Sequence, residues 1–163
     1  MSDYSNYLSV FSWRYGSNEM RRLFSLETKF KTWRKVWAAL ARVQQKYGLL
    51  TKYELEDIVK HADDVNIDEI LEIEKSTHHD VVAAIREFSR KAKIGGGKIH
   101  LGATSMDIVD NSEAYCLKEA LILIENKIHS VLKILAVLIY KYADTPALGF
   151  THLQPAEPTT VGY

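Results

Sequence analysis

The sequence has little cysteine and no excess of charge of either sign, and each shortage excludes a class of protein. Cys116 is the only cysteine in 163 residues, so no internal disulfide can form and no metal site can be built from several thiolates. The 21 basic and 21 acidic residues cancel, which argues against an extended surface for DNA or RNA. Residues 1–4 include no basic segment leading into an apolar core. We therefore expect a cytoplasmic protein without a secretory signal.

The sequence also lacks an apolar run that could span a bilayer. Its best candidate, residues 117–142, carries charged side chains throughout, so we expect no contact with membrane. Apolar residues recur there at steps of three and four, and neither Gly nor Pro interrupts residues 111–144. This spacing predicts a packing helix of roughly 50 Å. So long a helix with so broad an apolar surface belongs in a helix bundle, shared with other subunits.

Helical spacing also dominates the rest of the chain. Residues suited to cap a helix precede four segments of apolar periodicity: Ser17, Ser25, Thr51 and Asn66. No segment shows the alternation that is typical of a strand. The sequence therefore predicts an all-α protein. We expect a small helical domain over residues 1–110, and the first long helix of a truncated bundle domain over residues 111–163.

The end of the chain places a histidine where prolines prevent a helix. His152 follows Thr151, and Pro155 and Pro158 keep this polar segment in a fixed, non-helical corner. A titratable imidazole in a rigid corner suits proton transfer near neutral pH. The run from Pro158 to Thr160 predicts the start of another helix. We therefore expect the 163 residues to be the front part of a longer protein.

A second polar cluster consists of His78, His79 and Asp80. The two histidines are adjacent, so on a helix they point about 100° apart and cannot easily bind one ion together. No other spacing of histidine or cysteine supports a metal site. The cluster either begins a helix, with Asp80 near the positive end of the helix dipole, or contacts a ligand.

Two further clusters leave similar alternatives open. Thr104 and Ser105 end a loop of small residues that either caps the long helix or offers backbone donors and hydroxyls to a carboxylate or phosphate. Arg14 and Tyr15 are either a surface cation beside a packed aromatic ring or a grip for an anionic or aromatic ligand.

Taken together and in this order, the clusters resemble the adenylosuccinate lyase family, within the fumarase/aspartase superfamily. The resemblance begins at about Arg14, and its strongest parts are residues 72–81, 100–105 and 149–156. It implies a carbon–nitrogen lyase of purine biosynthesis. This enzyme would release fumarate from adenylosuccinate, giving AMP, and from the succinyl-aminoimidazole carboxamide ribotide. The resemblance also implies a homotetramer and no metal or organic cofactor.

The resemblance assigns roles to single residues. His152 matches the proton donor to the leaving nitrogen, and His79 matches a histidine that supports this step and contacts the ligand. The other matches are ligand contacts: Arg14 and Tyr15 at the nucleotide phosphate, Thr104 and Ser105 at the succinyl part, and Asp80 and Thr151. His78 is also a candidate contact, but the family usually has arginine there. An imidazole is shorter and not always charged, so we expect a shift in substrate affinity.

The family's signature loop, a serine-rich segment ending in Lys-Arg-Asn-Pro that supplies the base, is absent from these 163 residues. The resemblance therefore implies that they have no lyase activity by themselves. Two alternatives stay open: another fumarate-releasing lyase such as argininosuccinate lyase, and a non-catalytic helical assembly module. Arg14, Tyr15 and residues 74–80 favour the purine enzyme.

Overall fold

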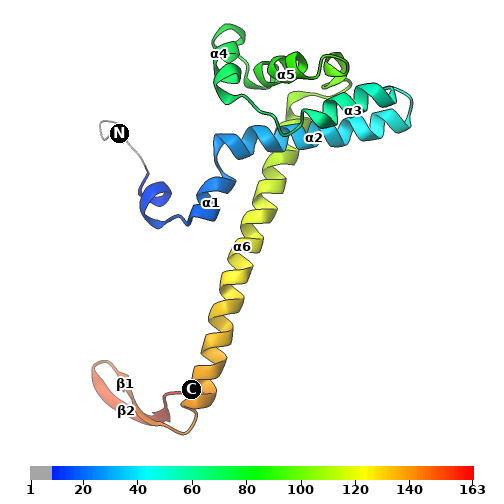
Figure 1. Ribbon diagram of the computed structural model, residues 1–163. Helices are drawn as coiled ribbons and strands as arrows, with labels where there is room; N and C mark the ends of the chain where they lie inside the picture. The colour runs from blue at the N-terminus through cyan, green and yellow to red at the C-terminus, as the bar shows by residue number, and fades with distance from the viewer. Residues whose placement is uncertain (1–8) are drawn as a thin grey trace. The chain divides into compact units, whose positions relative to one another are not determined.

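A computed structural model describes residues 9–163, so the first eight residues of the expected N-terminal domain lie outside the described chain. In chain order the elements are a π-helical turn (Phe11–Tyr15), α1 (Asn18–Leu23), α2 (Leu26–Lys46), α3 (Lys52–Lys60), α4 (Ile67–Thr77), α5 (Asp80–Lys91), a 3-10 turn (Gly96–Lys98), α6 (Ser105–Lys141), β1 (Pro146–Thr151) and β2 (Gln154–Thr160) (Figure 1). Helices dominate, and the only strands in the described chain form one small hairpin. The predicted all-α class is confirmed.

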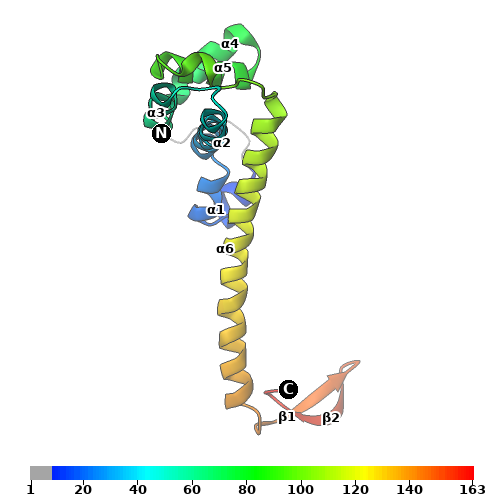
Figure 2. The same ribbon diagram turned by 90° about the vertical axis from the view of Figure 1, so that its right-hand side faces the viewer.

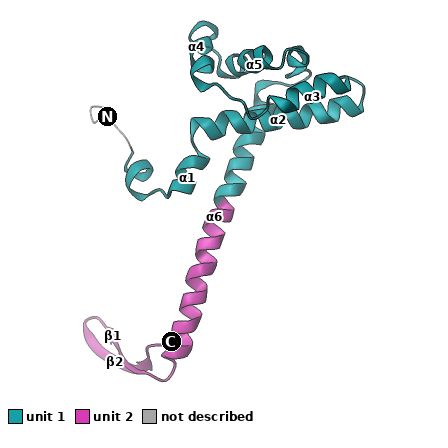
Figure 3. Ribbon diagram, viewed as in Figure 1, with its two compact units in different colours: residues 1–120 teal, residues 121–163 magenta. Residues whose placement is uncertain are grey.

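The chain divides into two compact units, Met1–Ala120 (unit 1) and Leu121–Tyr163 (unit 2) (Figure 3). The division falls inside α6, which therefore begins in unit 1 and ends in unit 2. Within unit 1, α3 runs along α2 and α5 packs beside α4 (Figures 1 and 2).

Side-chain caps fix where the helices of unit 1 begin. Each of the four predicted caps accepts a hydrogen bond from the backbone N–H three residues further on: Ser17, Ser25, Thr51 and Asn66. At Thr51 the cap is reciprocal, because the Glu54 carboxylate accepts the backbone N–H of Thr51 at 2.7 Å. Lys98 donates to the same carboxylate at 3.0 Å. The Thr51 N–H, followed by Lys98, lowers the pKa of Glu54 to about 2.

Unit 1 is expected to lose stability as the pH falls through the titration range of Glu54. A carboxyl whose pKa drops from 4.5 to about 2 on folding stabilises the protein above pH 4.5, and this contribution is lost towards pH 2. Glu54→Gln in the complete protein should therefore flatten the fall in unfolding temperature over that range. Glu56→Gln, at an exposed carboxylate of the same helix, is the control. If the unfolding temperature of Glu54→Gln fell with pH as steeply as that of the wild type, Glu54 would not be the group responsible.

The core of unit 1 is built on one face of α2. Phe30, Trp33 and Trp37 are each at most 2% exposed. Their rings meet edge to face, with centroids 5.4 Å apart for the first pair and 6.2 Å for the second. Phe88 of α5 packs against Trp37, with the two ring centroids 6.1 Å apart. This aromatic face of α2 is the surface on which α5 packs.

A buried ion pair lies beside the aromatic core. Arg34 of α2 is 1% exposed and Glu87 of α5 is fully buried, and the guanidinium donates to the carboxylate. Arg34 also donates to the carbonyls of His61, at 2.6 Å, and Asp64, at 2.7 Å. The second oxygen of Glu87 accepts the backbone N–H of Asn66 at 3.0 Å. The pair therefore ties α2 and α5 to the loop between α3 and α4.

Helix α6 begins at Ser105, six residues before the predicted Asn111, and runs for 37 residues. From Leu117 onward most of the large apolar residues of α6 are exposed in the described chain: Leu117, Leu121, Ile122, Ile124, Ile128, Val131, Leu132, Ile134, Leu135, Val137, Leu138, Ile139 and Tyr140. A helix that is apolar on most sides needs partners to cover it. No helix within residues 9–163 has the length and apolar character required to cross a membrane.

Unit 2 ends in a β-hairpin that the sequence did not predict. Strands β1 and β2 are antiparallel, and Pro155 and Pro158 pair with Phe150 and Leu148. A proline cannot donate to a ladder, but in a two-stranded sheet every strand is an edge, where proline is tolerated. The predicted helix starting at Pro158 is wrong, because β2 continues through Thr160.

Candidate functional site

The second polar cluster forms the corner between α4 and α5. His78 ends α4 in the left-handed conformation, with φ of 51°. His79 caps α5, because its Nδ1 accepts the backbone N–H of Val82 at 3.5 Å. A neutral ring that accepts at Nδ1 carries its proton on Nε2. The side chain of His79 is 46% exposed, so it combines a capping role with access to a ligand.

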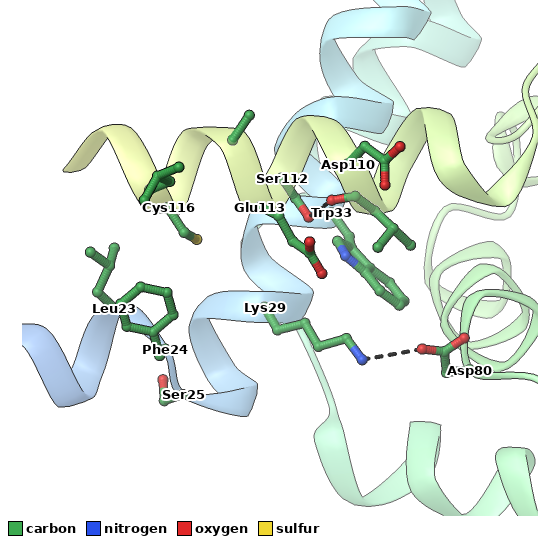
Figure 4. A pocket seen from close by; sticks show the side chains of 13 residues that line it. Leu23, Phe24, Ser25, Lys29, Trp33, Asp80, Asp110, Ser112, Glu113 and Cys116 are labelled. Carbon is green, nitrogen blue, oxygen red and sulfur yellow. Dashed lines mark hydrogen bonds and ion pairs between the residues drawn. The ribbon is translucent and has the colours of Figure 1, made fainter. Parts of the chain in front are cut away.

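Asp80 begins α5 and is held from α2. Its carboxylate forms an ion pair with the ammonium group of Lys29, with the nitrogen and oxygen 3.1 Å apart (Figure 4). Lys29 also lies over the Trp33 ring, 4.7 Å from its centroid. Asp80 is the first residue of α5, as the first of the two alternatives expects, and its acid group lies at the positive end of the helix dipole.

The loop before α6 is attached to α2 through His100. The indole N–H of Trp37 donates to Nδ1 of His100 at 3.0 Å, and the rings meet at 83°. Burial lowers the pKa of His100, Asp107 acts in the opposite direction, and the charge of His79 adds to the lowering. The imidazoles of His79 and His100 therefore influence each other electrostatically within unit 1.

Thr104 and Ser105 form the start of α6. The backbone N–H of Thr104 donates to the Asp107 carboxylate at 2.8 Å, which closes the first turn. Just upstream, Gly102 has φ of 71°, a left-handed conformation that glycine adopts without strain. The segment therefore caps the helix. Within residues 9–163 neither hydroxyl of this pair makes a hydrogen bond, so both stay available to a ligand.

Arg14 and Tyr15 close the π-helical turn in unit 1. The Arg14 guanidinium lies 5.8 Å from the centre of the Tyr15 ring, which is 69% exposed. In the described chain no hydrogen bond or ion pair joins these residues to His79 or to Ser105. The structure pairs them with each other and leaves both open to solvent.

Thr151 and His152 lie in unit 2, at the turn of the hairpin. Thr151 pairs with Gln154, which leaves His152 and Leu153 as the two turn residues. Their φ angles are 51° and 63°. Two consecutive left-handed residues are typical of the type I′ turn that joins tightly paired strands. The predicted non-helical corner is confirmed, because residues 152 and 153 form the turn between two paired strands.

A cavity of about 850 Å³ adjoins the second cluster within unit 1 (Figure 4). Lys29, Trp33 and Phe24 line one side, and Ser112 and Cys116 of α6 line the other. Among the predicted site residues only Asp80 contributes to its lining. In the described part of the chain, no group of three or more His, Cys, Asp or Glu residues is placed to hold a metal ion.

The sequence analysis included His100 in the segment 100–105 but assigned it no role. His100 is in the same loop as the predicted Thr104 and Ser105, and it shares an electrostatic environment with His79. The sequence shows His100 at the start of this cluster but does not indicate its contact with Trp37. That contact joins residues 63 positions apart and needs the fold.

Comparison with known proteins places these features in a family. The family described as lyase matches residues 14–163. The adenylosuccinate lyase of Saccharomyces cerevisiae is 40% identical over 167 residues, which cover 99% of this chain and 34% of that protein. The adenylosuccinate lyase of Methanocaldococcus jannaschii is 41% identical over 153 residues, covering 92% and 33%.

A solved structure supports the same fold. The fumarate lyase from Mesorhizobium sp. BNC1 matches with a TM-score of 0.82 and 30% identity, over 90% of this chain and 35% of that one. The chain therefore spans about a third of the length of the curated relatives and of this structure, 34% for the first relative.

Proposed function

The chain belongs to the lyase family, which matches it over residues 14–163, and on this basis we propose that the complete protein is an adenylosuccinate lyase. The observation that carries the proposal is the similarity to relatives of that name, at 40% identity across 99% of the chain for the first. The reaction is a β-elimination that breaks a carbon–nitrogen bond. Adenylosuccinate would give AMP and fumarate, and the succinyl-aminoimidazole carboxamide ribotide would give its amide and fumarate.

His152 is proposed as the acid of this elimination. A base outside the 163 residues takes the proton from the carbon beside a carboxylate, and His152 protonates the nitrogen as its bond to carbon breaks. The type I′ turn supports this role, because the strands on both sides fix the backbone of His152 and Leu153. A group that is already oriented needs no reorganisation in the transition state.

The candidate residues of unit 1 are proposed as the ligand side of the site. The Nε2–H groups of His79 and His100 would donate to anionic oxygens, and Asp80 lies beside His79 at the start of α5. The hydroxyls of Thr104 and Ser105 are proposed to contact the succinyl part.

Two further contacts complete the proposed ligand set. Arg14 and Tyr15 would hold the nucleotide phosphate, since an exposed guanidinium next to a phenol can bind phosphate oxygens. Thr151 would contact the ligand from the hairpin, next to His152. No metal or organic cofactor enters this scheme.

Replacing His78 by arginine is expected to lower KM for adenylosuccinate severalfold. An arginine can grip a carboxylate or phosphate with two parallel hydrogen bonds, whereas an imidazole offers one and is not always charged. The measurement is KM of His78→Arg in the complete protein. His129→Arg, at an exposed position on α6, controls for the added charge. An unchanged KM in His78→Arg would remove the idea.

Residues 1–163 by themselves are expected to release no fumarate. The proposed base lies outside them, and the apolar surface of α6 lacks partners within the described chain. We propose that α6, from about residue 111, starts a bundle that assembles as a homotetramer in the cytoplasm. Fumarate formation by the purified 163-residue chain would contradict the proposal that the base lies outside these residues.

Two alternatives remain, another fumarate-releasing lyase and a helical assembly module, and they differ in the substrates they cleave and the ligands they bind. Supplying argininosuccinate and adenylosuccinate in turn to the complete protein distinguishes the two lyases, since only the cleaved substrate yields fumarate. A helical assembly module would neither cleave them nor bind AMP. We expect cleavage of adenylosuccinate and no cleavage of argininosuccinate, and the reverse result would overturn the proposal.

A further inference from the structure

The side chain of Trp37 runs from the core of unit 1 to the candidate site. Its ring is fully buried, and its indole N–H donates to Nδ1 of His100 at 3.0 Å. An indole nitrogen can donate a hydrogen bond but cannot accept one. Nδ1 of His100 must therefore be the acceptor, and the single proton of the neutral ring lies on Nε2. The buried core thus selects one of the two neutral forms of this histidine.

We propose that Trp37 is a positioning residue, which holds His100 as a neutral imidazole with its Nε2–H directed to the ligand. This inference rests on the proposed function, because it assigns His100 to the site that binds adenylosuccinate. A hydrogen bond from a fully buried ring fixes both the tautomer and the orientation of the imidazole. The ligand then meets a donor that is already in place.

Gln44 supports the same arrangement from the same helix. It lies seven residues, or about two turns, after Trp37 on α2, so both side chains project from one face. Its amide Nε2–H donates to the carbonyl of Leu101 at 2.6 Å. One contact therefore fixes the ring of His100, and the other fixes the backbone next to it. Together they attach the loop to the buried face of α2.

Burial and the neighbouring charges also influence whether His100 is neutral or protonated. Burial favours the neutral ring, and the neighbouring His79 at the start of α5 acts in the same direction. Asp107 of α6 favours the charged ring and opposes them. The Trp37 N–H adds a geometric restraint, because a proton on Nδ1 would point at the indole hydrogen. Removing this N–H should let Nδ1 take a proton and raise the pKa of His100.

The test compares Trp37→Phe with Trp33→Phe in the complete protein. Both variants replace an indole of the same aromatic core by a smaller phenyl ring, but only Trp37→Phe removes the donor to His100. We expect kcat/KM for adenylosuccinate to fall about tenfold in Trp37→Phe, and the acid limb of its pH profile to move to higher pH. Trp33→Phe should keep the wild-type limb. Equal losses with unshifted limbs in both variants would overturn the inference.

A second pair of variants leaves the core intact. In His100→Gln the side-chain NH₂ falls near the position of Nε2, whereas in His100→Asn it falls near Nδ1, opposite the Trp37 donor. His100→Gln should therefore retain more activity than His100→Asn and lose the acid limb that His100 causes. A more active asparagine variant would show that the proton belongs on Nδ1 and would overturn the proposal.

A spectroscopic measurement separates this inference from the proposed function. The side-chain ¹⁵N signals of His100 are identified by their loss in His100→Gln. We expect a protonated Nε2 in the wild type and a mixture of tautomers in Trp37→Phe. The same tautomer in both proteins would overturn the positioning role, whatever the activity. Absence of cleavage by the wild type, with the tautomer change intact, would overturn the proposed function alone.

Discussion

His152→Gln in the complete protein is expected to lower kcat for adenylosuccinate by roughly 10²- to 10⁴-fold, the usual contribution of a general acid. Glutamine keeps a polar side chain of similar length but cannot release a proton near neutral pH. The leaving nitrogen would then depart without protonation. KM should change less than kcat, because the proposed ligand contacts of unit 1 remain. The measurement is steady-state fumarate release by the purified variant.

His129→Gln is the matched control for this experiment. His129 is exposed on α6 and is not among the candidate site residues. Its replacement should leave kcat within about twofold of the wild type, because His129 has no role in the proposed proton transfer. Equal kcat values for His152→Gln and the wild type would exclude His152 as the acid.

Glu87→Ala is expected to destabilise unit 1 by about 3–5 kcal/mol, the cost of breaking a buried ion pair by removing one partner. Arg34 would keep its charge in a site where it is 1% exposed, and the N–H of Asn66 would lose its acceptor. Arg34 would still donate to two carbonyls, which do not neutralise it. Denaturant unfolding followed by tryptophan fluorescence measures the effect, because Trp33 and Trp37 lie in the same core.

A surface pair provides the comparison for this variant. Glu69 bonds Arg90 at 2.8 Å, but the arginine side chain is 62% exposed. Glu69→Ala should therefore shift the unfolding midpoint little, since exposed pairs contribute about 0–1 kcal/mol. Similar shifts for Glu87→Ala and Glu69→Ala would contradict the structural importance of the buried pair.

The helices could be predicted from the sequence because their signals are local. A cap such as Ser25 acts on a residue three positions away, and the periodicity of α2 is set by the face that it buries. The hairpin could not be predicted, because its strands are largely exposed on both faces and show no alternation of apolar and polar residues. Leu153 gave no sign of the turn either, because glycine or asparagine is the residue usually found in the left-handed conformation of such turns.

The candidate residues of the site were visible as polar clusters at helix ends, but their surroundings were not. Nothing near Asp80 in sequence indicates Lys29, which is 51 residues away. Similarly, the contact between Trp37 and His100 depends on how α2 packs beneath the loop. Residue type and order therefore predicted which side chains are candidates for the chemistry, and that assignment stays a prediction. The contacts that orient them come from long-range packing, which a sequence pattern does not specify.

The most direct test is to incubate the purified complete protein with adenylosuccinate and measure both products. Cleavage of one carbon–nitrogen bond requires AMP and fumarate in equal amounts, and we expect this with the wild type and almost none with His152→Gln. Intact adenylosuccinate after incubation with the folded wild-type protein would contradict the proposed activity.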